Sequence, residues 1–436
     1  MQLKKKINYY FFDLKKFIEI LIYLFPFVLI WGNFAINFVI LLIDVLFLAY
    51  VFLNIKILKL NRPEYIVALI VWFIFFTTDY FVELSINSQS ASSLRFFIFF
   101  IAVAEIVRDK FSIIKNLSII SFTLLVLISF DLIFQSIFGY NIIGIKSDTS
   151  IRNASFFIDE YIAGTFIVRL YIFSFIFLFI FLKKTWFSYS YLFLIIFSFF
   201  GVFASGDRMP IFVLLLLVVF TTALTLKTKI ISYKFFLSYF LLGLLFLGIL
   251  SQNLSSDQKA RYFEDVIVKT HLHEIFSNTF IQNIYNNYVD LELNVYNRQS
   301  IPTSQIDLMK ISFEIFNKNK IIGIGQKNFY KKCLEIFDQC ENHPHNYYVQ
   351  LLTEKGVINF AIVTALVIFS IFKFIKNYKN IYFFSIFSCL LNFIFPFMFS
   401  GSLFTTGNAS YLFFILALLT IQFKNDKFLN NNILKI

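Results

Sequence analysis

The sequence predicts an all-α integral membrane protein that crosses the membrane many times. Hydrophobic residues make up 59% of its 436 residues, and charged residues make up only 15%. Apolar runs of roughly the length that spans a bilayer recur along most of the chain, which is typical of polytopic helical membrane proteins. This composition excludes a soluble globular fold.

Twelve apolar runs follow one another and are interpreted as membrane spans, so we expect about 12 transmembrane helices. They cover residues 17–31, 35–53, 66–82, 94–107, 118–138, 162–182, 189–204, 209–226, 235–250, 357–372, 381–399 and 408–423. No A-x-A-like cleavage site follows the first run, so we expect it to remain as a span.

The Lys and Arg residues predict the orientation. They cluster in the even-to-odd connections, as at Lys183 and Lys184, whereas odd-to-even connections such as "SGDR" are poor in them. The positive-inside rule then places both termini in the cytoplasm. The net charge of +12 is explained by these orientation signals, and it implies no nucleic-acid partner.

One connection is large, from Ser251 to Asn342, and this orientation places it outside. Within it, "SQIDLMKISFEIF" begins with Ser304 and Asp307 at the spacing of a capping box. Apolar residues then recur with helical periodicity at Ile306, Met309, Phe313 and Phe316. We predict an amphipathic helix that lies on the membrane surface or covers the bundle.

The spans and the loop divide the chain into four regions. These are the N-terminal helices (1–130), the helices with Arg-bearing outer loops (131–250), the large loop with the candidate catalytic motif (251–356) and the C-terminal helices (357–436). The sequence has no Gly-rich phosphate loop and no metal-ligand spacing, and "GIGQKNF" is interpreted as a tight turn. We therefore expect no metal and no cofactor.

The motif "HPHN" has a geometry suited to acid–base chemistry. Pro344 suits the first turn of a helix and Gly356 suits its C-terminal cap, so we predict a helix over 344–355 with His345 in its first turn. A helix N-terminus disfavours imidazolium, which keeps the ring neutral and able to accept a proton, and it attracts phosphate oxygens. All four His lie in predicted outer segments: His271, His273, His343 and His345.

Three Arg residues, Arg152, Arg208 and Arg261, also lie in predicted outer segments. The planar fork of Arg donates two hydrogen bonds at once, which suits it to phosphate. A structural alternative for Arg208 is an interfacial side chain that reaches water or pairs with Asp207. Three Arg and a neutral His on one side of a membrane suggest a lipid-linked phosphate as ligand.

These motifs carry a resemblance. "HPHNYYVQLLTEKG" resembles the H-x-H-N-x-Y-L-x-x-L-x-E-x-G signature of the O-antigen ligase and polymerase family. "GIGQKNF" and "SGDRMP" are similar to the turns that precede it in that family, and the segment 131–164 looks like polymerase-type members. The resemblance spans roughly residues 131–360, with a family core at about 190–365. Asn359 departs from it, because many members have Gly there.

The resemblance implies a metal- and nucleotide-independent, inverting glycosyltransferase of the bacterial inner membrane. Its donor would be a glycan on a polyprenyl diphosphate, its acceptor a glycan or lipid A core, and its site periplasmic. His345 would be the general base, with Arg208 and Arg152 holding the diphosphate. The other expected substrate-binding residues are Arg261, His343, Asn346 and Glu354. Glu354, nine positions from His345, would orient a loop or an Arg.

Cys333 and Cys340 face the oxidising compartment if the orientation holds, so we predict a disulfide between them. On one continuous helix their Cα atoms would lie about 10 Å apart, beyond the limit of roughly 7 Å. The bridge therefore requires a helix end near Asp338. Free thiols are the alternative, and Cys389, inside a predicted span, should stay reduced.

Two other classes of protein compete with the enzyme. A transporter or lipid-linked oligosaccharide flippase also fits twelve spans, but it predicts two related halves and ionisable residues at the midplane. A structural subunit would explain none of the Arg and His positions. Within the family, ligase, polymerase and protein O-glycosyltransferase stay open, and the segment 131–164 favours a polymerase.

Overall fold

A computed structural model describes residues 2–53, 62–84, 89–108, 110–146, 152–158, 160–234, 237, 305–336, 340–377, 381–395 and 401–420. Within these ranges the regular elements are helices, and the only pairing of extended chain is one isolated bridge between Tyr140 and Lys146. The elements are α1 (Gln2–Val28), α2 (Gly32–Leu53), α3 (Pro63–Glu83), α4 (Gln89–Ser92), α5 (Leu94–Val107), α6 (Phe111–Phe138), η1 (Ser155–Phe157), α7 (Ala163–Phe181), α8 (Lys184–Ala204), α9 (Arg208–Lys227), α15 (Gln305–Lys318), α16 (Phe329–Leu334), α17 (Tyr347–Asn377), α18 (Ile381–Cys389), α19 (Leu391–Ile394) and α20 (Thr406–Leu419).

Eight of the described helical segments are long and apolar enough to cross a membrane. They are α2, α3, α4 together with α5, α6, α7, α8, α9 and α17. Two shorter apolar stretches, 382–394 and 406–419, overlap the last two predicted spans. The predicted span at 235–250 lies outside the described residues except for residue 237. The all-α polytopic class is therefore confirmed, and the count of twelve and the orientation stay predictions.

The bundle buries some of its aromatic residues between helices and leaves other apolar side chains exposed. Of the eight segments, α7 is the most enclosed: 72% of the residues in its most apolar stretch are buried. Phe25 of α1 packs on Phe414 of α20 with ring centroids 4.7 Å apart. On α2, by contrast, Phe34 and Phe52 are 84% and 81% exposed. Apolar surface of this extent calls for a hydrocarbon environment.

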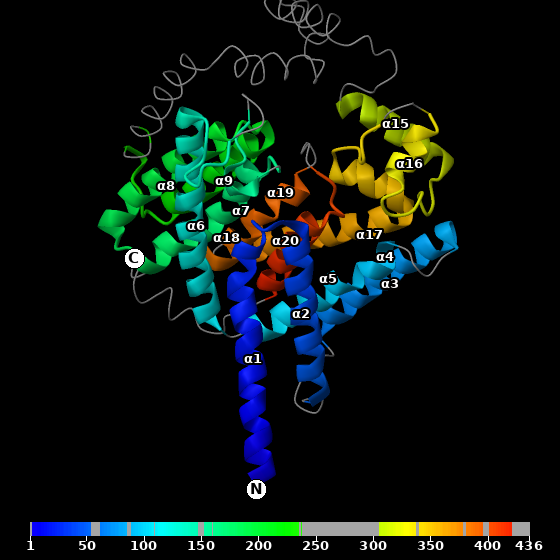
Figure 1. Ribbon diagram of the computed structural model, residues 1–436, viewed down its shortest axis with the longest axis horizontal. Coiled ribbons are helices and arrows are strands. Elements are labelled where there is room, and N and C mark those ends of the chain that lie inside the picture. Colours follow the sequence, from blue (N-terminus) through cyan, green and yellow to red (C-terminus); the bar gives the residue numbers. More distant parts are fainter. Residues whose placement is uncertain are drawn as a thin grey trace, which may run out of the picture.

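The described part of the large loop forms a small unit beside α17, on the side of the molecule away from the N-terminus (Figure 1). Its helix α15 agrees with the predicted amphipathic helix, but the buried face is different. Leu308, Ile311 and Ile315 are buried against α16 and α17, whereas Phe313 of the predicted stripe is 46% exposed. The helix carries two apolar stripes, and periodicity alone does not identify the one that has a partner.

Helix α17 changes direction at Gly356, whose φ of 70° and ψ of −179° are not helical. The predicted break at this glycine is therefore present, although a second helical segment follows it at once. The interruption separates a short segment that begins at Tyr347 from the long apolar segment that follows. It also frees backbone groups of α17 for contacts with the neighbouring loop.

Candidate active site

The motif segment, residues 340–356, is anchored by an N-terminal helix cap. Asn346 is 4% exposed, and its Oδ1 accepts hydrogen bonds from the backbone N–H groups of Tyr348 at 3.0 Å and Val349 at 3.1 Å. Asn is among the best capping residues because its side chain satisfies N–H groups that the first turn leaves open. The helix therefore begins at Tyr347.

The prediction that the helix begins at Pro344, with His345 in its first turn, is wrong. His345 has a φ of 55°, a left-handed conformation that the first turn of an α-helix cannot contain. Pro344 and His345 instead form a bend ahead of the Asn346 cap. The helix begins after Asn346 because this cap accepts hydrogen bonds from two backbone N–H groups. Proline at the first helical position forms no such bond; it only lacks an N–H group that would have no partner there.

The two histidines of the motif lie against each other at this bend. The ring centroids of His343 and His345 are 4.3 Å apart. Nε2 of His343 is buried and makes no hydrogen bond to a described residue. Burial, together with the nearby His345, lowers the pKa of His343 to about 4, so its ring is neutral near pH 7. The neutral imidazole is therefore that of His343, whereas the sequence predicts a neutral ring for His345.

Glu354 is fully buried and faces the loop that follows α15. Gln350 donates through Nε2 to Glu354 Oε2 at 3.3 Å and to Ser402 Oγ at 2.7 Å, which ties the first turns of α17 to the segment before α20. Lys327 lies close enough to interact electrostatically with Glu354. Burial lowers the pKa of Lys327. The predicted separation of Glu354 from His345 by nine positions of one helix does not apply, because His345 precedes the helix.

The kink in α17 is filled by the Gly loop, residues 320–328. Gly325 N donates to Glu354 O at 2.9 Å, and Val357 N donates to Lys320 O at 2.9 Å. A continuous helix would have paired these two α17 groups with its own backbone. The Gly loop therefore replaces hydrogen bonds that the non-helical Gly356 breaks.

These hydrogen bonds require the backbones of the Gly loop and of α17 to lie in contact. This close approach explains why Gly323 and Gly356 are glycines. A Cβ on Gly356 would lie 2.3 Å from Ile321 O, and a Cβ on Gly323 would lie 2.5 Å from the carbonyl carbon of Glu354. Both glycines also have positive φ, at 70° and 74°. The turn "GIGQKNF" and the segment "HPHNYYVQLLTEKG" are thus two halves of one interlocked structure.

The predicted Arg residues lie on the turn between α8 and α9 and on the segment before η1. Arg152 pairs with Asp207 and donates to Tyr161 O at 3.0 Å. Asn153 Nδ2 donates to Ala204 O at 2.7 Å, so the segment is fastened to this turn. Asp207, considered as a partner for Arg208, is held by Arg152. Arg208 is the first residue of α9.

Helix α19 connects the two groups of candidate residues. Tyr347, two residues after His345, stacks on Phe393 of α19 at 5.6 Å. Phe395, just after α19, packs on Phe212 of α9 at 5.3 Å. The histidine bend and the start of α9 thus flank the same short helix. Arg261, His271 and His273 lie outside the described residues.

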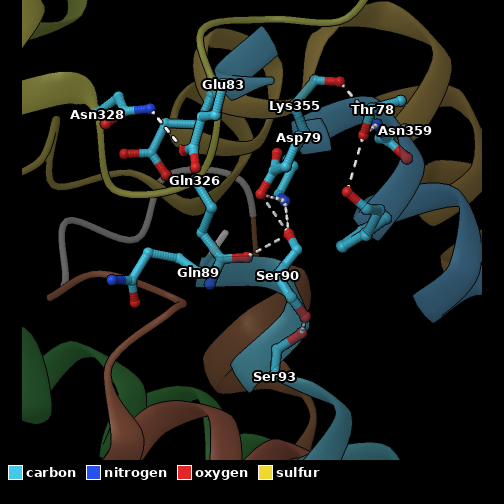
Figure 2. Close-up of polar contacts among 12 residues, drawn as sticks. Thr78, Asp79, Glu83, Gln89, Ser90, Ser93, Gln326, Asn328, Lys355 and Asn359 are labelled. Carbon is cyan, nitrogen blue, oxygen red and sulfur yellow. Dashed lines mark hydrogen bonds and ion pairs between the residues drawn. The ribbon is translucent and has the colours of Figure 1, made fainter. Parts of the chain in front are cut away.

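Sequence reasoning missed a buried ion pair behind the motif segment (Figure 2). Lys355 Nζ lies 2.8 Å from Asp79 Oδ2, both side chains are fully buried, and both contact the hydroxyl of Ser90. Ser90 also donates to Gln326 Oε1 at 3.0 Å. The network joins α3, α4, the Gly loop and α17.

A second missed residue is Arg169 in α7, which contacts Asn408 and Tyr411 of α20. The signal for both omissions was present, because an ionisable residue inside an apolar run marks function or a specific partner. Asp79 and Arg169 each stand alone in such a run. The sequence does not indicate the partner of either residue. Lys355, the partner of Asp79, lies 276 positions away in the chain.

The described structure joins Cys333 and Cys340 in a disulfide, with their Cα atoms 6.0 Å apart. Helix α16 ends at Leu334, immediately after the first cysteine, so the helix stops before the bridge as the spacing requires. Asp338 itself lies outside the described residues. Cys389 is buried and free.

We expect the same bridge in the purified protein. Mass spectrometry after alkylation without reductant should find the Cys333 and Cys340 peptides linked, with Cys389 labelled only after unfolding as an internal control. Closing a loop of about eight residues should stabilise the fold by about 2.5 kcal/mol on the chain-entropy estimate. A labelled, unlinked Cys333 peptide would contradict the bridge.

The comparison with known families agrees with these motifs. Residues 191–364 match the family model described as O-antigen ligase, a range that includes the α8–α9 turn, the Gly loop and the motif segment. No curated protein matches the chain. This part of the chain is therefore similar to the O-antigen ligase family.

Proposed function

We propose that the protein transfers a glycan from a polyprenyl-diphosphate-linked donor to a hydroxyl group, on the predicted periplasmic face of the inner membrane. The observation that carries the proposal is the histidine bend at the start of α17, with a neutral His343 against His345. The family match supports the same reaction class. The transporter alternative explains neither the bend nor the Arg residues before η1 and at the start of α9.

His345 is proposed as the general base. It would take the proton from the acceptor hydroxyl while that oxygen attacks the anomeric carbon of the donor. The bond from this carbon to the diphosphate breaks, and the negative charge stays on the departing diphosphate. Attack opposite to the leaving group inverts the anomeric configuration.

Arg208 and Arg152 are proposed to stabilise the departing diphosphate. Arg152, Asp207 and Arg208 carry two positive charges and one negative charge, so the group keeps a net charge of +1. Asp207 fixes the guanidinium of Arg152 in one orientation, which is the preorganisation that charge stabilisation requires. We propose that these groups replace a metal ion in the reaction, and that no nucleotide is needed.

Replacing Arg208 by Ala and by Lys should distinguish the contribution of its charge from that of its planar, two-donor geometry. Arg208→Ala should reduce transfer by about 10²- to 10³-fold, as loss of one charge-stabilising donor does, because both the charge and the fork are removed. Arg208→Lys keeps the charge but loses the fork, so it should be clearly impaired, though less than Arg208→Ala. Transfer is measured with purified protein, with Lys227→Ala at the other end of α9 as control. Equal activity of Arg208→Lys and wild type would contradict bidentate binding.

Deleting the gene distinguishes the reactions within the family. The lipopolysaccharide of the deletion strain is separated on a gel, with a complemented strain as control. Loss of all O-chain indicates a ligase, and a single remaining repeat unit indicates a polymerase. The segment 131–164 leads us to expect the second pattern. An unchanged ladder would contradict a role in this polysaccharide.

A further inference from the structure

Arg169 is a cation placed inside an apolar helix. It lies in the second turn of α7, which is the most enclosed of the described membrane segments. Its Nη2 donates to Asn408 Oδ1, and its guanidinium carbon lies 5.0 Å from the centroid of the Tyr411 ring. Tyr411 in turn donates through its hydroxyl to Arg169 O at 3.0 Å. Both side-chain partners are neutral.

No carboxylate within the described ranges forms a salt bridge with Arg169, whereas other cations of the bundle have one. Arg108 pairs with Glu105, Arg152 with Asp207 and Lys355 with Asp79. A cation without a counter-charge in an apolar setting is costly, and such residues commonly face a binding site or an ion pathway. This cost points to an anion that is absent from the protein chain itself.

The position of Arg169 is next to the candidate active site. Tyr347, the first residue of α17, lies close enough to interact electrostatically with Arg169. Tyr347 also stacks on Phe393, whose ring lies 6.2 Å from that of Tyr411. Because His345 precedes Tyr347 by two residues, their Cα atoms are at most about 7 Å apart.

A hydrogen-bond chain joins the guanidinium to α17. Asn408 Nδ2 donates to Ser402 O at 2.8 Å, and Gln350 of α17 donates to Ser402 Oγ at 2.7 Å. Asn408 is thereby oriented by the helix that the histidine bend precedes. A guanidinium has five N–H donors, and among the described contacts Arg169 uses only those on Nη2.

The Arg169 side chain is only partly buried, so it is not sealed off from its surroundings. A small cavity lies beside Arg169 on the side of Pro26 and Leu117, but its volume of about 10 Å³ has room for no more than one water molecule. A phosphate group therefore cannot approach from that side. Tyr347, at the start of α17, interacts electrostatically with Arg169, and this is the side that we consider for the approach of a ligand.

We propose that Arg169 binds a phosphate oxygen of the lipid-linked donor, from the bundle side of α17. The identity of the donor rests on the function proposed above. Arg169 would then be a third cation for the diphosphate, separate from Arg152 and Arg208 on the α8–α9 turn. Its depth in α7 suits a headgroup whose polyprenyl chain stays in the bilayer.

Binding of a polyprenyl diphosphate that carries no sugar tests this assignment. We expect Arg169→Gln, which can keep the hydrogen bond to Asn408 but lacks the charge, to bind the probe at least about tenfold more weakly than wild type, as loss of a charged hydrogen bond predicts. Arg169→Lys should bind with intermediate affinity. Arg108→Gln, which also removes a bundle arginine, should bind as wild type does, and polyprenol without phosphate should show no difference among these proteins.

Wild-type affinity of a folded Arg169→Gln protein for the diphosphate would overturn the proposal. An equal loss in Tyr411→Phe, which keeps the charge and weakens the α7–α20 contact, would also overturn it by showing a structural role. If no transfer is found in any assay but the Arg169 effect remains, only the proposed function fails. If transfer is found without the Arg169 effect, only this inference fails.

Discussion

His345→Ala should lower the rate of glycan transfer by about 10²- to 10⁴-fold, the usual loss when a general base is removed. The physical reason is that no other group at the bend is assigned to take the proton of the acceptor hydroxyl. Transfer is measured with purified protein at saturating donor, so that the loss appears in kcat. Expression and membrane insertion should be unchanged, because the alanine removes only the side chain at a bend that Asn346 caps.

His271→Ala is the matched control, since His271 also lies in the predicted outer loop but outside every motif of the family. It should transfer glycan at the wild-type rate. A His345→Ala protein that keeps more than about half of wild-type activity would show that the base has been assigned to the wrong residue.

Lys355→Met should destabilise the protein by about 3–5 kcal/mol, the usual cost of removing one partner of a buried ion pair. Asp79 would be left fully buried with an uncompensated charge, and Ser90 alone could not replace the ammonium group. The free energy of unfolding is measured by denaturant titration in detergent. The double variant with Asp79→Leu should recover most of the loss, because it removes both charges.

Lys332→Met serves as the control for this pair. Lys332 pairs with Glu335 at 2.8 Å, but both side chains are largely exposed, so its loss should cost less than about 1 kcal/mol. Similar losses in Lys355→Met and Lys332→Met would contradict a specific role for the buried pair. A double variant as unstable as Lys355→Met would show that Lys355 acts through something other than Asp79.

The helices were largely predictable because apolar length is a local property. The run at 94–107 has the bounds of α5, and the run at 209–226 lies within α9. The glycine break at Gly356 was also predictable, since positive φ favours glycine. Each of these features depends on residues close to one another in the chain.

The details that failed depend on competition or on distant partners. Pro344 and Asn346 both offered a helix start, and the cap with two hydrogen bonds prevailed. The buried face of α15 was decided by α16 and α17, which the periodicity of α15 does not encode. Lys355 with Asp79, and Arg169 with Asn408, join segments more than two hundred positions apart.

The most direct test of the proposed reaction uses purified protein in lipid nanodiscs with a polyprenyl-diphosphate-linked oligosaccharide, a hydroxyl acceptor, a metal chelator and no nucleotide. Wild-type protein should release polyprenyl diphosphate and form a longer or transferred glycan with inverted linkage, whereas His345→Ala should not. If the donor stays intact with wild-type protein, or if the same protein in vesicles only moves the donor across the bilayer, the glycosyltransferase assignment is contradicted.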